Sequence, residues 1–135
     1  MDTPPDTGSL LRLEVGRLRA RESRRVFDAS LHIGTLAGDR DSSQLLAQDL
    51  PALDAGLRVD VVGRLLAHRD APGGTAWLVR PGLPELSDRD LAWFAASTTA
   101  FGIHAVRIDG FYVITRTGWL DVRNGGGRTW KRLRL

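Results

Sequence analysis

The sequence predicts an α+β fold: a mixed, mainly antiparallel sheet that ends in a C-terminal β-meander and packs against N-terminal helices and a helix over residues 88–101. Three observations predict it. The first half of the chain has apolar residues at helical spacing, and the segment around residue 30 alternates apolar and polar residues. The C-terminal third holds short apolar runs separated by glycine-containing turns.

The length and composition predict one globular domain. The chain has 135 residues, of which 42% are hydrophobic and 26% charged, which is ordinary for a single folded domain. We expect a disordered leader over residues 1–8 and a single α+β domain over residues 9–135. Neither a secretory signal nor an apolar stretch of membrane-spanning length is visible in the sequence, so we expect a cytoplasmic protein without a membrane partner.

The first expected element is a helix over residues 9–24, because Leu11, Val15 and Leu18 recur at helical spacing. Residues 26–33 then alternate apolar and polar side chains, which is the period of a strand with one buried face. Residues 34–43 are rich in turn-forming residues and predict a loop.

A second helix is expected over residues 49–68, where apolar residues recur every four positions. These residues are Leu53, Leu57, Val61 and Leu65. Residues 75–80 form a short apolar run that ends at Pro81-Gly82, a pattern typical of a buried strand.

The helix over residues 88–101 has the clearest boundaries. Ser87 is a good N-cap, and Asp90 stands three residues later, as in a capping box. Gly102 occupies the position expected of a left-handed C-cap.

Turn-forming residues divide the C-terminal third into antiparallel strands. Asp109-Gly110 favours a two-residue hairpin, and Thr117-Gly118 favours a further turn. Residues 124–127, Asn-Gly-Gly-Gly, are expected to close the last hairpin with Arg123 opposite Arg128. The chain would therefore end in a β-meander.

The residue types exclude several kinds of active site. There is no cysteine, which removes thiolate metal sites and cysteine nucleophiles. No histidine stands at the spacing of a familiar metal site, and phosphate-binding and serine-hydrolase motifs are missing. We therefore expect no metal and no cofactor, and a binding or regulatory module rather than an enzyme. A small enzyme of unidentified chemistry, with a pocket away from the last hairpin, is an alternative.

Positive charge is concentrated at the end of the chain. The net charge is +3, and residues 116–135 hold six basic residues against one acid. In the expected register, most of these arginines share one face of the last hairpin with two tryptophans. Guanidinium groups bind phosphates and indole faces stack on bases, so nucleic acid or another anionic partner is expected here. The candidate site residues are Arg116, Trp119, Arg123, Arg128, Trp130, Arg132 and Arg134.

Two other interpretations of this Trp/Arg face remain open. It could be purely structural, either as a cross-strand ladder in which Trp119 faces Arg132, or as a core face covered by the N-terminal helix. Tryptophan and arginine are also typical anchors of protein interfaces, so the face could join two copies of the chain in a homodimer or bind another protein.

Four short motifs in the C-terminal half resemble a family of small proteins from high-GC, actinobacterium-like genomes. They are Trp-Leu-x-Arg-Pro-Gly at residues 77–82, Asp-x-Asp-x-x-Trp at 88–93, Thr-Arg-x-Gly-Trp at 115–119 and Arg-x-Trp-x-Arg-x-Arg at 128–134. The resemblance implies no particular activity.

Overall fold

The fold was determined from a computed structural model, which describes residues 5–38, 41–46, 54–67 and 73–131. The six strands form one mixed sheet in the order β2-β1-β3-β4-β5-β6. Only β3 and β4 are parallel; all other neighbouring strands are antiparallel. The predicted α+β class with C-terminal strands is therefore confirmed. The elements are α1 (Pro5–Arg21), β1 (Ala29–Gly34), β2 (Asp41–Leu46), α2 (Ala55–Leu66), β3 (Gly73–Val79), α3 (Asp88–Ile103), β4 (Arg107–Thr115), β5 (Gly118–Asp121) and β6 (Gly127–Thr129).

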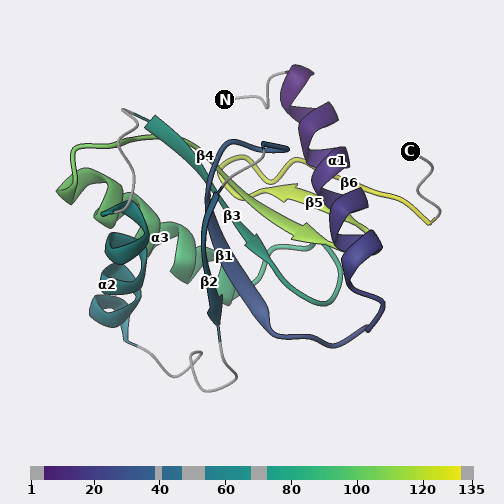
Figure 1. Cartoon of the computed structure of the whole chain (residues 1–135), viewed down its shortest axis with the longest axis horizontal. Helices are drawn as coiled ribbons and strands as arrows, with labels where there is room; N and C mark the ends of the chain where they lie inside the picture. The colour runs from purple at the N-terminus through teal and green to yellow at the C-terminus, as the bar shows by residue number, and fades with distance from the viewer. Residues whose placement is uncertain (1–4, 39–40, 47–53, 68–72, 132–135) are drawn as a thin grey trace.

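The sheet is the middle of three layers, with α1 on one face and α2 and α3 on the other (Figure 1). Successive side chains of a strand point to opposite faces of the sheet. The central strands contain runs of consecutive apolar residues, so they have apolar side chains on both faces. One buried cluster lies between the sheet and α2 and α3, and includes Phe101, Phe111 and Leu120. The other lies between the sheet and α1, and includes Trp77 and Trp119. We call the second cluster the α1 core.

The N-terminal helix has the predicted buried face but different bounds. Leu11, Val15 and Leu18 are all buried in the α1 core. The helix begins at Pro5 and ends at Arg21, so residues 5–8, expected in a disordered leader, form its first turn. Proline suits this start because its missing N–H has no partner in the first turn of a helix.

The expected loop over residues 34–43 is wrong at its end, because residues 41–46 form the edge strand β2. Asp, Ser and Gln have low strand propensity, so the strand depends on backbone pairing with β1, which a local reading misses. The predicted alternation is confirmed within β1, where Ala29, Leu31 and Ile33 are buried against α2 and α3. The strand begins at Ala29 and not at residue 26, and Phe27 packs against the α1 core instead.

The second predicted helix is confirmed over its C-terminal part. Asp54 caps α2 by accepting a hydrogen bond from the Leu57 amide at 2.9 Å. The predicted start at Asp49 lies outside the described residues. Leu57, expected on the buried face, is exposed, and the buried face consists of Val61, Val62, Leu65 and Leu66.

The capping box of α3 is confirmed, but its C-terminal end is not at Gly102. The helix continues to Ile103, and Ala105 adopts the left-handed conformation with a φ of 54°. The Val106 amide donates to the Phe101 carbonyl at 2.9 Å and the Ala105 amide to the Gly102 carbonyl at 3.2 Å. This is a Schellman motif with alanine in the position that glycine usually takes.

The predicted hairpin at Asp109-Gly110 is wrong, because β4 passes through both residues. Asp109 is the extra residue of a β-bulge against β3. Gly110 leaves room for the Tyr112 ring, whose nearest atom would lie 2.7 Å from a Cβ at that position. Pairing with β3 therefore overrides the local turn preference, and β3, α3 and β4 form a parallel β-α-β unit.

The last hairpin exists, but its register is not the predicted one. Trp119 pairs with Arg128 and Leu120 with Gly127, so Arg123 does not face Arg128. The turn closes nearer to β5 than predicted, because the Asp121 amide donates to the Gly126 carbonyl at 2.7 Å and the Gly125 amide donates to the Asp121 carbonyl at 2.8 Å. Asn124 then closes the loop by accepting from the Gly126 amide at 2.7 Å.

Candidate anion-binding site

Three chain segments meet beyond the carboxyl ends of the parallel strands β3 and β4. Residues 80–86 follow β3, and residues 116–117 follow β4. Residues 22–28 reach the same edge because β1 runs antiparallel to β3, with Ser30 opposite Val79. Ligand sites in sheets with β-α-β units commonly lie at this edge, outside the carboxyl ends of the strands.

These segments enclose a cavity of about 410 Å³, which we call the Arg25/Arg116 pocket. Two guanidinium groups and the Thr117 side chain supply its polar groups, while aromatic and aliphatic side chains supply its apolar surface. Pockets for small ligands typically combine an apolar lining with a few convergent polar groups. Its lining residues are Arg25, Phe27, Pro81, Gly82, Leu83, Arg116 and Thr117.

A buried arginine holds the loop that forms one wall of this pocket. Arg80 donates to Asp90 through Nε and Nη2, both at 2.8 Å. It also donates to the carbonyl oxygens of Pro81 and Leu83 at 3.0 Å and of Glu85 at 2.8 Å. Because these bonds fix the loop backbone, the pocket wall is organised without a ligand.

Two cations line the pocket, and the carboxylate of Glu22 attracts one of them from beside it. Arg24 donates to Glu22 at 2.6 Å, and this bond holds the pKa of Glu22 below its ordinary value, with Arg116 adding a smaller attraction. Among the described residues, neither Arg25 nor Arg116 makes a hydrogen bond or an ion pair. The Arg116 Nε is buried without a partner. Unpaired buried donors are uncommon in folded proteins.

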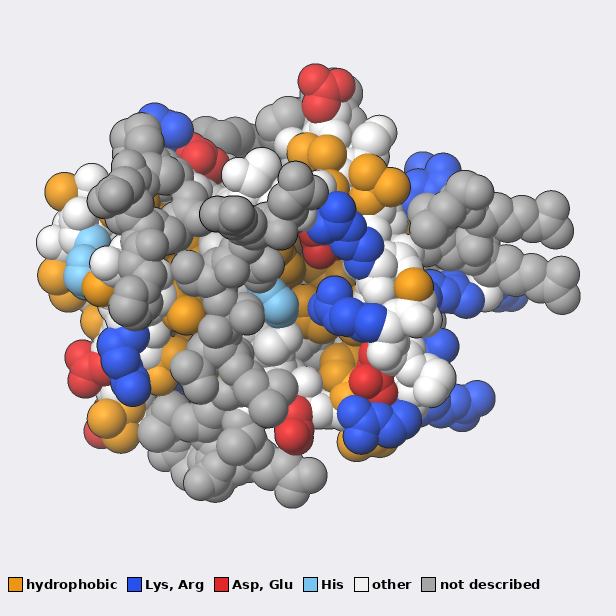
Figure 2. All heavy atoms as spheres, viewed as in Figure 1, with side chains coloured by type: hydrophobic (Ala, Val, Ile, Leu, Met, Phe, Trp, Pro, Cys, Tyr) orange, Lys and Arg blue, Asp and Glu red, His pale blue; other side chains and the backbone are white. Residues whose placement is uncertain are grey.

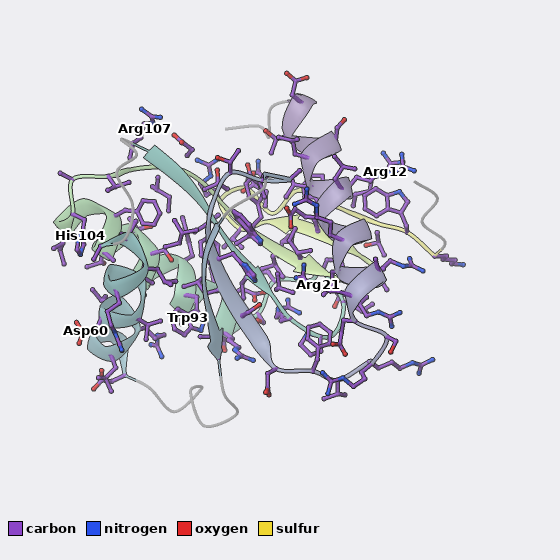
Figure 3. The ribbon with its side chains drawn as sticks, viewed as in Figure 1. Arg12, Arg21, Asp60, Trp93, His104 and Arg107 are labelled. Carbon is purple, nitrogen blue, oxygen red and sulfur yellow. The ribbon has the colours of Figure 1, made fainter. Side chains whose placement is uncertain are left out.

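Positive charge extends from this pocket over α1. Lys and Arg side chains gather over α1 and the chain beside it, on the right of the view in Figure 2. Arg12 and Arg21 project from α1, whereas Asp60 and His104 lie on the α2 and α3 side (Figure 3). Arg21 lines a neighbouring cavity of about 310 Å³, which shares Phe27 with the Arg25/Arg116 pocket. A ligand larger than the pocket would therefore meet further arginines.

The structure places Trp119 inside the protein, under α1. Its exposed fraction is 8%, and it packs in the α1 core. This position corresponds to the alternative in which the N-terminal helix covers the face. An indole packed in this way has no free face on which a base could stack.

Trp130 is half-buried at the border of the α1 core. The guanidinium of Arg128 lies 5.3 Å from the ring centre and that of Arg12 lies 6.0 Å from it. These are cation–π distances, so the ring joins the last strand to α1. Arginines of the protein itself therefore occupy the surroundings of this indole.

The remaining predicted site residues that the structure describes do not form one surface. Arg123 lies beside the buried carboxylate of Asp121, with its Nε 3.8 Å from Oδ1. Arg116 belongs to the Arg25/Arg116 pocket instead. Arg132 and Arg134 lie outside the described residues. The structure thus brings Arg128 and Trp130 together, and separates Trp119 from the surface.

A buried hydroxyl lies close to Asp121 and Arg123. Burial raises the pKa of the Tyr112 hydroxyl above its ordinary value, and the negative charge of Asp121 adds to the rise. Tyr112 packs in the α1 core, away from the Arg25/Arg116 pocket. We assign it a structural place in that core.

Sequence reasoning missed most of the pocket. Arg25, Phe27 and Leu83 carry no recognisable motif and come from two separate loops. A signal was present in the polar or turn-forming residues that follow each buried strand, Arg80-Pro81-Gly82 and Arg116-Thr117. These residues indicate a common site only if β3 and β4 are parallel neighbours. The hairpin expected at residues 109–110 was incompatible with that arrangement.

Other kinds of site find no support in the part of the chain that the structure describes. No three His, Asp or Glu side chains come together there as metal ligands. None of the described helices is both long and apolar enough to cross a membrane. No protein-family model, curated protein or solved structure matches the chain.

Proposed function

We propose that the protein is a small cytoplasmic binding module that captures an anion in the Arg25/Arg116 pocket. One observation carries this proposal: two guanidinium groups without a partner among the described residues line the same cavity, and no carboxylate lines it. Guanidinium groups form strong, directed hydrogen bonds with phosphate and carboxylate oxygens. A bound anion would supply the acceptors that these cations otherwise lack.

The lining supports a binding role rather than catalysis. It contains no His, Asp, Glu or Lys that could act as a general acid or base. Its one hydroxyl, on Thr117, forms a hydrogen bond with the hydroxyl of Thr115, with the two Oγ1 atoms 3.3 Å apart, and a hydroxyl is not a base. A threonine needs a neighbouring base to become a nucleophile.

Nucleic acid is a second candidate partner, favoured by the exposed arginines beyond the pocket. Contact would be made through backbone phosphates, because Trp119 is buried and Trp130 lies against Arg12 and Arg128. Affinity for duplex DNA or RNA should then fall steeply as salt rises, since bound phosphates release counter-ions. Fluorescence anisotropy over a series of salt concentrations would measure this slope.

The first experiment is an NMR titration of the uniformly labelled protein with inorganic phosphate at constant ionic strength. Saturable shifts are expected for the backbone amides of residues 25–28, 81–83 and 116–118. Sodium chloride at the same ionic strength should not reproduce them. Shifts that are absent, or spread evenly over the surface arginines, would refute a specific anion site.

A further inference from the structure

We infer that the ligand of the Arg25/Arg116 pocket is a phosphomonoester that carries an aromatic or other apolar group. This inference rests on the proposed function and narrows it to one chemical class. It uses two features together: two positive charges in a lining that contains no carboxylate, and the apolar side chains that share the pocket with them.

The charge of the pocket fits a dianion. Arg24 and Glu22 neutralise each other, and the carboxylate of Asp28 does not line this cavity. Arg25 and Arg116 therefore contribute two positive charges without a negative charge in the lining. A phosphomonoester is largely dianionic near neutral pH, because its second pKa is about 6, whereas a carboxylate has a single charge. Phosphate also has three oxygens with which to bridge two guanidinium groups.

The apolar part of the pocket fits the organic group of such an ester. Leu83 is 55% exposed, so the core does not require it. Arg80 nevertheless holds the backbone of Leu83 by donating a hydrogen bond to its carbonyl oxygen, and this bond keeps the leucine in the pocket wall. Phe27 and Pro81 line the same cavity, and Phe27 packs against the α1 core from the other side. A ligand that covered these three side chains would remove apolar surface from water, which favours binding.

The size of the cavity agrees with a small ligand. Its volume, about 410 Å³, lies in the lower part of the range of roughly 300–1,000 Å³ that is usual for small-molecule sites. The bonds of Arg80 hold the loop from within the protein, so little ordering is required on binding. An isolated phosphate would leave the apolar side of the pocket in water.

Calorimetric titrations near neutral pH with phenyl phosphate, inorganic phosphate and benzoate test the inference. Phenyl phosphate should bind at least about tenfold more tightly than inorganic phosphate, because it also buries apolar surface. It should likewise bind at least about tenfold more tightly than benzoate, because the carboxylate has one charge less. Equal affinities of phenyl phosphate and inorganic phosphate would overturn the apolar part of the inference. Equal affinities of phenyl phosphate and benzoate would overturn the choice of phosphate.

Two leucines of the same loop provide a matched pair of variants. Leu83→Ser should abolish most of the advantage of phenyl phosphate over inorganic phosphate. Leu86→Ser is the control, because Leu86 is similarly exposed but does not line the pocket. If phosphate binds and Leu83→Ser has no effect, the inference fails while the proposed function stands. If neither phosphate nor phenyl phosphate binds the wild-type protein, both fail.

Discussion

Arg80 and Asp90 form a bidentate ion pair in the interior of the protein. Nε donates to Oδ1 and Nη2 donates to Oδ2, each at 2.8 Å, and the Asp90 side chain is fully buried. Asp90 also accepts a hydrogen bond from the Ser87 amide at 3.0 Å, as part of the capping box of α3. The pair therefore joins the end of β3 to the start of α3, and the remaining donors of Arg80 hold the loop between them.

Removing the Arg80 side chain should strongly destabilise the protein. Arg80→Ala leaves the Asp90 carboxylate buried without its cation, a change that typically costs about 3–5 kcal/mol of unfolding free energy. Urea denaturation followed by circular dichroism measures the loss. Arg107→Ala is the control, because the Arg107–Asp109 pair is exposed to solvent and such pairs contribute little to stability. Equal losses in the two variants would contradict this account of the loop.

The tryptophans should differ sharply in their accessibility to acrylamide. Trp77, Trp93 and Trp119 are buried, whereas Trp130 is half-buried, so Trp130 should supply most of the quenchable fluorescence. Trp130→Phe should therefore remove most of the quenching, and Trp119→Phe should leave it nearly unchanged. Strong loss of quenching in Trp119→Phe would place that indole at the surface and restore the Trp/Arg face as a surface for stacking bases.

The one tyrosine of the chain should titrate above its ordinary range. Burial favours the neutral hydroxyl of Tyr112, so the native protein holds this proton to a higher pH than the unfolded chain, where the pKa is about 10. The resulting contribution to stability is complete below about pH 10 and is lost as the pH rises through the native pKa. Tyrosinate absorbance, recorded with and without denaturant, measures both midpoints. A native midpoint equal to or below that of the unfolded chain would contradict the burial of Tyr112.

Local sequence patterns were sufficient to predict an element wherever the residues of that element specify it by themselves. The capping box of α3 and the alternation in β1 are examples, since each depends on residues only a few positions apart. One strand could not be found in this way, and another was wrongly divided into two. The polar edge strand β2 exists through its pairing with β1, and β4 passes through Asp109-Gly110 because β3 pairs with both sides of the bulge.

The same limit explains why the candidate site was only partly predicted. Alternation in the last hairpin correctly separated Trp119 from Leu120, but it could not show that α1 covers one face and α2 and α3 the other. Arg116 was selected for its charge, and its partners in the pocket come from segments distant in the sequence. Their convergence depends on the antiparallel pairing of β1 with β3 and on the parallel pairing of β3 with β4.

The most direct test of the central claim is the affinity for inorganic phosphate of two single variants, Arg25→Gln and Arg116→Gln, relative to wild type. Each variant should bind about tenfold to a hundredfold more weakly, since each loses charge-assisted hydrogen bonds of about 1.5–3 kcal/mol. Arg128→Gln, a charge change at Trp130 outside the pocket, should bind as wild type does. Unchanged affinity in both pocket variants, or an equal loss in Arg128→Gln, would show that phosphate is not held by Arg25 and Arg116.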